Sequence, residues 1–128
     1  MALIPEDLRY SKNHMWVRMK DGVAVIGVTD YAQDQMGGIT YMRIPSAGSY
    51  LAAGEACGMV ESVKATTDLV CPVKGEVLEA NVDLDSTPEL CNSDPYGKGW
   101  ILRIKTAEAP KDLMDAAAYE AFCKTASK

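Results

Sequence analysis

The chain alternates hydrophobic and polar residues over several short stretches, which is the pattern of half-buried β-strands. From residue 14 to residue 29 the alternation continues on both sides of Asp21-Gly22, a pair typical of two-residue hairpin turns, and it predicts a β-hairpin. The same criteria predict further strands at 39–44, 56–63, 66–73, 75–82 and 100–106. Many short strands separated by turn residues at intervals of about ten residues are typical of a sandwich or flattened barrel.

Other stretches predict helices. Thr29 or the aspartate after it can cap a short helix that Gly37-Gly38 ends. One helical turn is expected at 88–91. Beyond the last strand the chain becomes alanine-rich, and apolar residues recur four apart, which predicts a C-terminal amphipathic helix at about 110–124 packed on the sheets.

A weak internal repeat links two parts of the β region. "PSAGSYLAA" at 45–53 and "PVKGEVLEA" at 72–80 share Pro, Gly, Leu and Ala at matching positions. Two similar β units related by a pseudo-two-fold axis would explain the match, and the hairpin that carries Lys64 would then join them. A chance similarity over so few positions is the alternative.

Length and composition restrict the function classes. The 128 residues fit one domain, which we place at 1–128 with its β core at about 12–106. A formal net charge of −5 argues against nucleic-acid binding, because binding to phosphates needs a basic face. No apolar run approaches the roughly 20 residues of a membrane helix, and the first residues lack the features of a targeting peptide. We therefore expect a cytoplasmic protein that does not enter membranes.

The cysteines do not form a metal-binding pattern. None of the four has CxxC spacing with another, and the single histidine, His14, is distant from all of them in sequence. We expect no metal site, and free thiols that behave as small buried hydrophobic residues. They are Cys57, Cys71, Cys91 and Cys123.

Lys64 lies between two predicted strands, in "MVESVKATTDLVCP" at 59–72. A nucleophilic lysine needs burial or a nearby cation, but its neighbours in sequence are Glu61 and Asp68, which would stabilise the ammonium form. The chain has no phosphate-binding GxxxxGK[ST] loop and no apparent Ser/His/Asp set, so no catalytic residue is predicted. Two interpretations remain open, an attachment point for a covalently bound group and an ordinary surface lysine.

Several blocks of the sequence together resemble one known family. The blocks are "YSKNHMWVR", "IGVTDYAQDQMG", "GMVESVKATTDLVCPVKGEVLEAN", "NSDPYGKGW" and "LMDAAAYEAF". In this order they are similar to the glycine cleavage system H proteins, from about residue 5 to residue 124. The resemblance implies the biotinyl/lipoyl carrier fold, a mostly β, flattened hybrid barrel-sandwich of two antiparallel sheets, with short helices and a C-terminal helix.

The resemblance also implies a cofactor. In that family the lysine of V-E-S-V-K-A carries lipoic acid in amide linkage, and the matching residue here is Lys64. Biotin carriers resemble M-K-M at this place, so Val63 and Ala65 favour lipoate. Glu61 and Gly75 are similar to positions that help a lipoate-attaching enzyme to recognise the hairpin, although a solvated acid and a turn glycine are the plain alternatives.

Two further residues are expected near the lipoyl arm. His14 and Asp68 belong to matching blocks, and we expect them to line a surface cleft that shelters the loaded arm. The alternative for His14 is an ordinary surface residue of the first hairpin.

The implied function is that of a shuttle without catalytic activity. It would carry an aminomethyl group from a pyridoxal-phosphate glycine decarboxylase to a tetrahydrofolate-dependent aminomethyltransferase, and electrons to a FAD-containing dihydrolipoamide dehydrogenase. A monomer suits a protein that visits several enzymes. An H-like protein that relays lipoyl groups to other acceptors, and an unlipoylated interaction module, are the alternatives.

Overall fold

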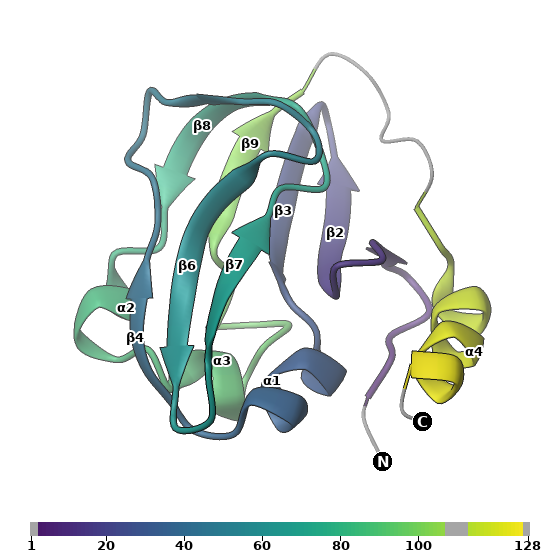
Figure 1. Cartoon of the computed structure of the whole chain (residues 1–128). Coiled ribbons are helices and arrows are strands. Elements are labelled where there is room, and N and C mark those ends of the chain that lie inside the picture. The colour runs from purple at the N-terminus through teal and green to yellow at the C-terminus, as the bar shows by residue number, and fades with distance from the viewer. Residues whose placement is uncertain (1–2, 107–112, 127–128) are drawn as a thin grey trace.

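The computed structural model describes residues 3–106 and 113–126. It is mostly β, with two antiparallel sheets packed face to face and helices at one end and one side (Figure 1). The six-stranded sheet has the order β1-β2-β3-β9-β8-β5, and the three-stranded sheet has the order β4-β6-β7. This architecture confirms the predicted fold class.

The larger sheet contains β1 (Arg9–Tyr10), β2 (Met15–Lys20), β3 (Val23–Val28), β5 (Tyr50–Leu51), β8 (Gly75–Ala80) and β9 (Leu102–Lys105). The smaller sheet contains β4 (Ile39–Arg43), β6 (Ala56–Ser62) and β7 (Thr66–Val70). The helices are α1 (Asp30–Met36), α2 (Asp83–Ser86), α3 (Leu90–Ser93) and α4 (Ala116–Ala126).

The predicted strands and the first helix are present, with ends that differ by a few residues. Thr29 caps α1 by accepting a hydrogen bond from the Ala32 amide, and Gly37 ends the helix. The predicted helical turn at 88–91 corresponds to α3, which begins two residues later, whereas α2 was not predicted. Strands β1 and β5 were not predicted, because two residues carry no readable alternation.

The C-terminal helix begins later than predicted. Met114 forms an isolated bridge with Tyr10, with backbone hydrogen bonds of 2.8 Å in both directions, so this part of the chain is extended. The Asp115 carboxylate then accepts a hydrogen bond from the Ala118 amide, which stabilises the first turn of α4. The first part of the predicted span, residues 110–112, lies outside the described residues.

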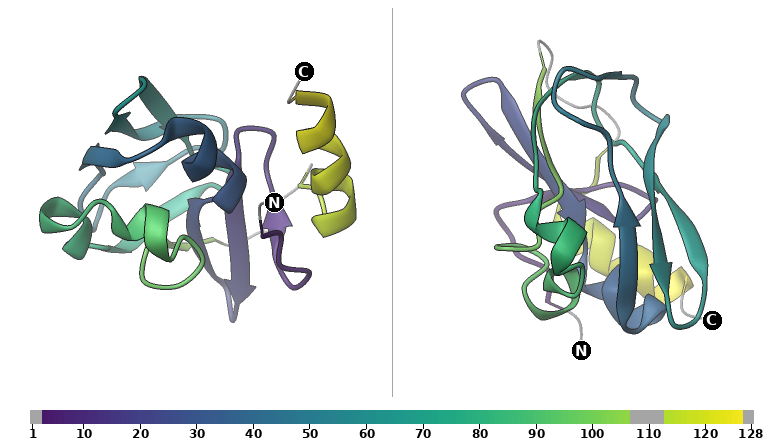
Figure 2. Two further views of the ribbon diagram at one scale, coloured as in Figure 1. Left: turned by 90° about the horizontal axis from the view of Figure 1, so that it is seen from below. Right: turned by 90° about the vertical axis from the view of Figure 1, so that its left-hand side faces the viewer.

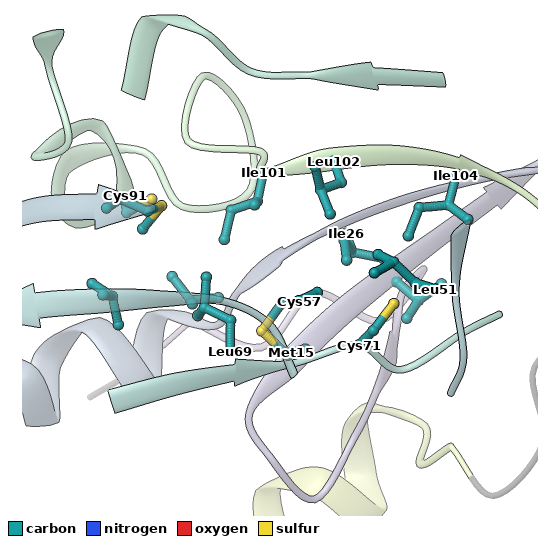
Figure 3. Packing of buried hydrophobic residues seen from close by; sticks show 14 of the residues in the cluster. Met15, Ile26, Leu51, Cys57, Leu69, Cys71, Cys91, Ile101, Leu102 and Ile104 are labelled. Carbon is teal, nitrogen blue, oxygen red and sulfur yellow. The ribbon is translucent and has the colours of Figure 1, made fainter. Parts of the chain in front are cut away.

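The main core fills the space between the two sheets. It contains one buried face of the larger sheet and one of the smaller, including Ile26, Leu69, Leu102 and Ile104 (Figure 3). A second cluster lies outside this sandwich, where α4 packs against β1 (Figure 2). Its fully buried members are Leu8, Tyr10, Trp16 and Tyr119.

Strand β2 is therefore buried on both faces along its first half only. Met15 and Val17 belong to the main core, and Trp16 between them belongs to the second cluster. Arg18, the first residue beyond this covered half, is exposed. The predicted alternation of buried and exposed faces fails at Trp16 because the segment after α3 covers it: the indole Nε1 donates a 2.9 Å hydrogen bond to the Pro95 carbonyl, and the Tyr96 ring lies 6.0 Å from the Trp16 ring.

The two copies of the internal repeat pair with each other. Leu51 lies opposite Gly75 and Tyr50 lies opposite Glu76, and the Val77 amide donates a 2.8 Å hydrogen bond to the Ser49 carbonyl. This antiparallel pairing is symmetric about Val63, next to Lys64. The arrangement is the one that a pseudo-two-fold axis through the lysine hairpin would produce.

All four cysteines are buried free thiols, as predicted. Cys57 and Cys71 both lie in the main core (Figure 3), and the Cys71 thiol donates a hydrogen bond to the Val73 carbonyl at 2.9 Å. Burial raises the pKa of Cys91 to about 12. Within residues 3–106 and 113–126, no group of three or more His, Cys, Asp or Glu side chains could hold a metal ion. No helix in these ranges is long and apolar enough to cross a membrane.

Candidate functional site: a lysine at a hairpin tip

Lys64 lies at the tip of the β6–β7 hairpin, at the lower end of the molecule in Figure 1. The turn is closed by a 2.9 Å hydrogen bond from the Ser62 amide to the Ala65 carbonyl. The Ser62 hydroxyl oxygen also accepts hydrogen bonds from the amides of Lys64 and Ala65, at 3.4 and 3.3 Å. One hydroxyl therefore orders the short segment that presents the lysine.

The tip also rests against the segment between α1 and β4. The Val63 amide donates a 3.0 Å hydrogen bond to the Gly38 carbonyl. A Cβ atom at Gly37 would lie 3.0 Å from Cγ2 of Val63 and 3.5 Å from Cε of Lys64. Gly37 has φ +77°, so glycine there both ends α1 and leaves room for the side chains of the tip.

A half-buried network of side-chain amides fixes this supporting segment. The Asn92 side chain, on α3, donates to the Gly37 carbonyl at 2.9 Å and to Oε1 of Gln33 at 2.8 Å, and its oxygen accepts from the Ile39 amide at 2.9 Å. Asn92 thus joins α1, α3 and β4 directly beneath the lysine hairpin. Sequence reasoning missed this role, although Asn92 begins the block "NSDPYGKGW".

The Lys64 side chain is exposed, and within the described part of the chain its ammonium has no hydrogen bond or ion-pair partner. The carboxylates of Glu61 and Asp68, its acidic neighbours in sequence, do not pair with the Lys64 ammonium. Register places Glu61 opposite Thr66 and Asp68 opposite Met59, so both acids lie on the outer face of the smaller sheet. An exposed, unpaired amine is chemically suited to modification and poorly suited to acting as a buried nucleophile.

His14 lies in the second cluster, before β2. Its backbone has φ +64°, and its Nδ1 is 2.7 Å from the Tyr119 hydroxyl, which is itself 2.7 Å from Oγ1 of Thr29. The rings of Tyr31 and Phe122 lie 4.9 and 5.6 Å from the imidazole. This partial burial lowers the pKa of His14.

His14 lies in the loop before β2 of the larger sheet and Asp68 lies on β7 of the smaller sheet, and among the described residues no hydrogen bond or ion pair joins them. A cleft of about 660 Å³ lies between the loop before β2 and the far end of β7, with Asn13 and Val70 in its lining. Asn13 is next to His14 in the sequence, and Val70 is two residues from Asp68. The role of His14 and Asp68 beside an arm stays a prediction.

Gly75 is the first residue of β8 and is buried. Its φ is +153°, and a Cβ atom here would collide with the Lys105 carbonyl oxygen on the neighbouring strand. The fold itself therefore requires glycine at this position. Recognition of Gly75 by a modifying enzyme stays a prediction.

An exposed lysine on a hairpin tip, projecting from two packed antiparallel sheets, is the arrangement of biotinyl/lipoyl carrier domains. The comparisons agree with this class. The family model for the glycine cleavage H-protein matches residues 8–126. The chain therefore belongs to the glycine cleavage H-protein family.

Individual relatives span nearly the whole chain. A glycine cleavage system H protein from Symbiobacterium thermophilum is 47% identical over 126 residues, which is 97% of this chain and 98% of the relative. One from Laribacter hongkongensis is 51% identical over 124 residues, which is 94% of this chain and 97% of the relative. The crystal structure of an H protein from Mycobacterium marinum superposes with a TM-score of 0.87 at 32% identity, covering 92% of this chain and 97% of that one.

Proposed function

We propose that this chain is the lipoyl-bearing shuttle of a glycine cleavage system, with lipoic acid attached to Lys64. The observation that carries the proposal is the unpaired, exposed amine on an ordered hairpin tip in a chain of this family. The site fits the group. Attachment condenses the lipoate carboxyl group with the lysine amine, and no ion pair within the described residues would be broken by the loss of the ammonium charge.

The bound lipoyl group would supply a strained cyclic disulfide that opens to accept an aminomethyl unit and closes again on oxidation. The side chains of the protein present the group and do not themselves make or break bonds, so we propose a carrier without catalytic activity. Ser62, Gly38 and Asn92 hold the base of the arm in a fixed position. After acylation the formal net charge becomes one unit more negative than −5.

The proposed partners are a pyridoxal-phosphate glycine decarboxylase, a tetrahydrofolate-dependent aminomethyltransferase, a FAD-containing dihydrolipoamide dehydrogenase and a lipoate-attaching enzyme. Glu61, exposed near the tip, and Gly75 would help the attaching enzyme to recognise the hairpin. His14 and Asp68 would line the path of the loaded arm. We further propose that residues 1–128 form one carrier domain, which works as a monomer in the cytoplasm.

Mass measurement on the protein from its native host tests the attachment. We expect a mass increase of one lipoyl group, located on the tryptic peptide that contains Lys64. Reconstitution with the decarboxylase and the aminomethyltransferase then tests the shuttle, with glycine–bicarbonate exchange as the readout. An unmodified native protein contradicts the attachment. A lipoylated protein that supports no exchange but passes its lipoyl group to other acceptors would instead be a lipoyl relay.

A further inference from the structure

The outer face of the larger sheet carries an apolar strip between two lines of cations. Strand β3 is paired with β2 on one side and with β9 on the other. Across these three strands, the register aligns Arg18, Val25 and Arg103 in one row. The next row on the same face contains Lys20, Val23 and Lys105.

These rows form an open cleft of about 520 Å³, lined by Arg18, Lys20, Arg103 and the half-buried Trp100, with Val23 and Val25 as its floor. We call it the β3 groove. It lies along the exposed half of β2, which begins at Arg18. The chain as a whole has a net charge of −5, so four cations in these two rows, Arg18, Lys20, Arg103 and Lys105, gather positive charge on an otherwise acidic chain.

Carboxylates approach the β3 groove from β8 and from the β2–β3 turn. Glu79 forms a 3.1 Å ion pair with Arg103, and Glu76 lies opposite Lys105, both from β8. Asp21 lines the end of the groove at the hairpin turn. On the β2 side, Arg18 and Lys20 form no ion pair within the described residues. Positive charge therefore remains available there for a ligand.

The two arginines are held in place by aromatic rings. The Arg18 guanidinium lies 5.1 Å from the centroid of the Trp16 ring and donates to the Tyr96 carbonyl at 3.2 Å. The Arg103 guanidinium lies 5.0 Å from the centroid of the Trp100 ring. Stacked guanidinium groups lose little conformational freedom on binding, and their remaining N–H groups match a carboxylate.

We propose that the β3 groove docks an extended acidic segment of one of the three enzymes that the shuttle serves, which rests on the proposed function. Side chains on one face of an extended segment repeat about every 6.6 Å, which is also the spacing between the two rows of the groove. Carboxylates at alternate positions would meet the cations of successive rows, and an apolar side chain would lie over the two valines.

The location of the groove supports docking rather than contact with the arm. The β2–β3 turn lies at the end of the molecule opposite the lysine hairpin (Figure 1). Lys64 belongs to the smaller sheet, whereas the groove lies on the far face of the larger sheet. A partner held in the groove would leave the base of the arm uncovered.

The test compares charge-reversed variants in the lipoylated protein. Arg18→Glu and Lys20→Glu each replace a groove cation, and Arg43→Glu on β4 is the control with the same charge change. We expect each groove variant to raise KM about tenfold for one of the three enzymes, with kcat unchanged. The rise should shrink at about 0.5 M salt, where charges are screened over a few ångströms. Lys20→Glu keeps the test decisive if Arg18→Glu disturbs the packing on Trp16.

Equal KM values for the groove variants and Arg43→Glu with all three enzymes would overturn the proposal. Dimerisation of the wild-type protein that Lys20→Glu abolishes would also overturn it, because the occupant would then be a second copy of the chain. In either case the wild-type protein would still support normal turnover in the same assay. If the proposed function were wrong, the wild-type protein itself would support no turnover.

Discussion

The two main hairpins of the molecule are held in different ways. In the β2–β3 turn, Asp21 and Gly22 have φ of +51° and +79°, the conformation that matches the twist of the flanking strands. The β6–β7 turn has no positive φ at Val63 or Lys64, and it depends on the Ser62 hydroxyl and on contacts with neighbouring elements. The first turn is encoded locally. The second, which carries Lys64, can be disturbed from residues distant in sequence.

The largest effect should come from Lys64→Arg, which keeps a positive charge at the tip but removes the amine. We expect complete loss of the lipoyl adduct and of glycine–bicarbonate exchange. The free energy of unfolding should change by less than about 0.5 kcal/mol, because the side chain is exposed and unpaired in the described residues. Mass spectrometry, the exchange assay and denaturant titration measure the three quantities. A lipoylated Lys64→Arg protein would show that the attachment site lies elsewhere.

Asn92→Ala should disturb the lysine hairpin from a distance. The change removes three hydrogen bonds that hold the segment around Gly37, and should lower the free energy of unfolding by about 2 kcal/mol. We expect lipoylation to become several-fold slower, because the support beneath Val63 is loosened. Initial rates of lipoate attachment, measured well below the midpoint of unfolding, provide the readout.

Asn81→Ala is the matched control, since Asn81 also donates two side-chain hydrogen bonds, to the carbonyls of Lys98 and Trp100. It should destabilise the protein to a similar degree without slowing lipoylation. Equal lipoylation rates for Asn92→Ala and the wild type would mean that the tip does not need this support.

Gly22→Ala probes the locally encoded hairpin. Alanine at φ +79° is strained, so the free energy of unfolding should fall by about 1 kcal/mol. Lipoylation should proceed at the wild-type rate, because this turn lies at the opposite end of the molecule. Thermal unfolding and the lipoate attachment assay test the two statements. A slowed attachment would refute the separation between the two hairpins.

The smallest expected effect is on the pH dependence of stability, through His14 just before the first hairpin. Burial lowers the pKa of His14 in the folded protein, so the unfolded chain binds more protons as pH falls below about 6.5. The histidine therefore favours the folded state above that pH, and this contribution is lost as pH falls through the folded pKa. We expect the drop in Tm between pH 7.5 and pH 5.5, roughly the range over which histidine titrates, to be smaller in His14→Asn. Asparagine tolerates the positive φ at this position. An identical drop in both proteins would show that His14 does not contribute.

The sequence allows the first hairpin to be predicted because its alternation and its Asp-Gly turn point to the same structure. It does not reveal that Trp16 is buried, because the indole packs against the Pro95–Tyr96 segment, and Pro95 is 79 residues away in sequence. The start of α4 was misplaced for a related reason. Alanine-rich composition indicates a helix, but pairing of Met114 with Tyr10 is a tertiary contact that overrides it locally.

At the candidate site, the position of Lys64 could be predicted from two strand patterns and a short motif. Its support could not be predicted, since Asn92 acts on the Gly37 carbonyl and no local pattern of residues signals that contact. For Gly75 the sequence did suggest a role, and the structure adds a second one. It was singled out as a recognition residue, and the structure adds a steric reason, the Lys105 carbonyl, that is independent of recognition.

The burial of the cysteines has a practical consequence for following the shuttle. All four thiols of the chain lie inside the protein, and burial raises the pKa of Cys91 further from neutrality. A water-soluble thiol reagent added to the folded, lipoylated protein should therefore react first with the sulfur atoms of the reduced arm. The redox state of a single flexible group could then be read out in solution without replacing any cysteine.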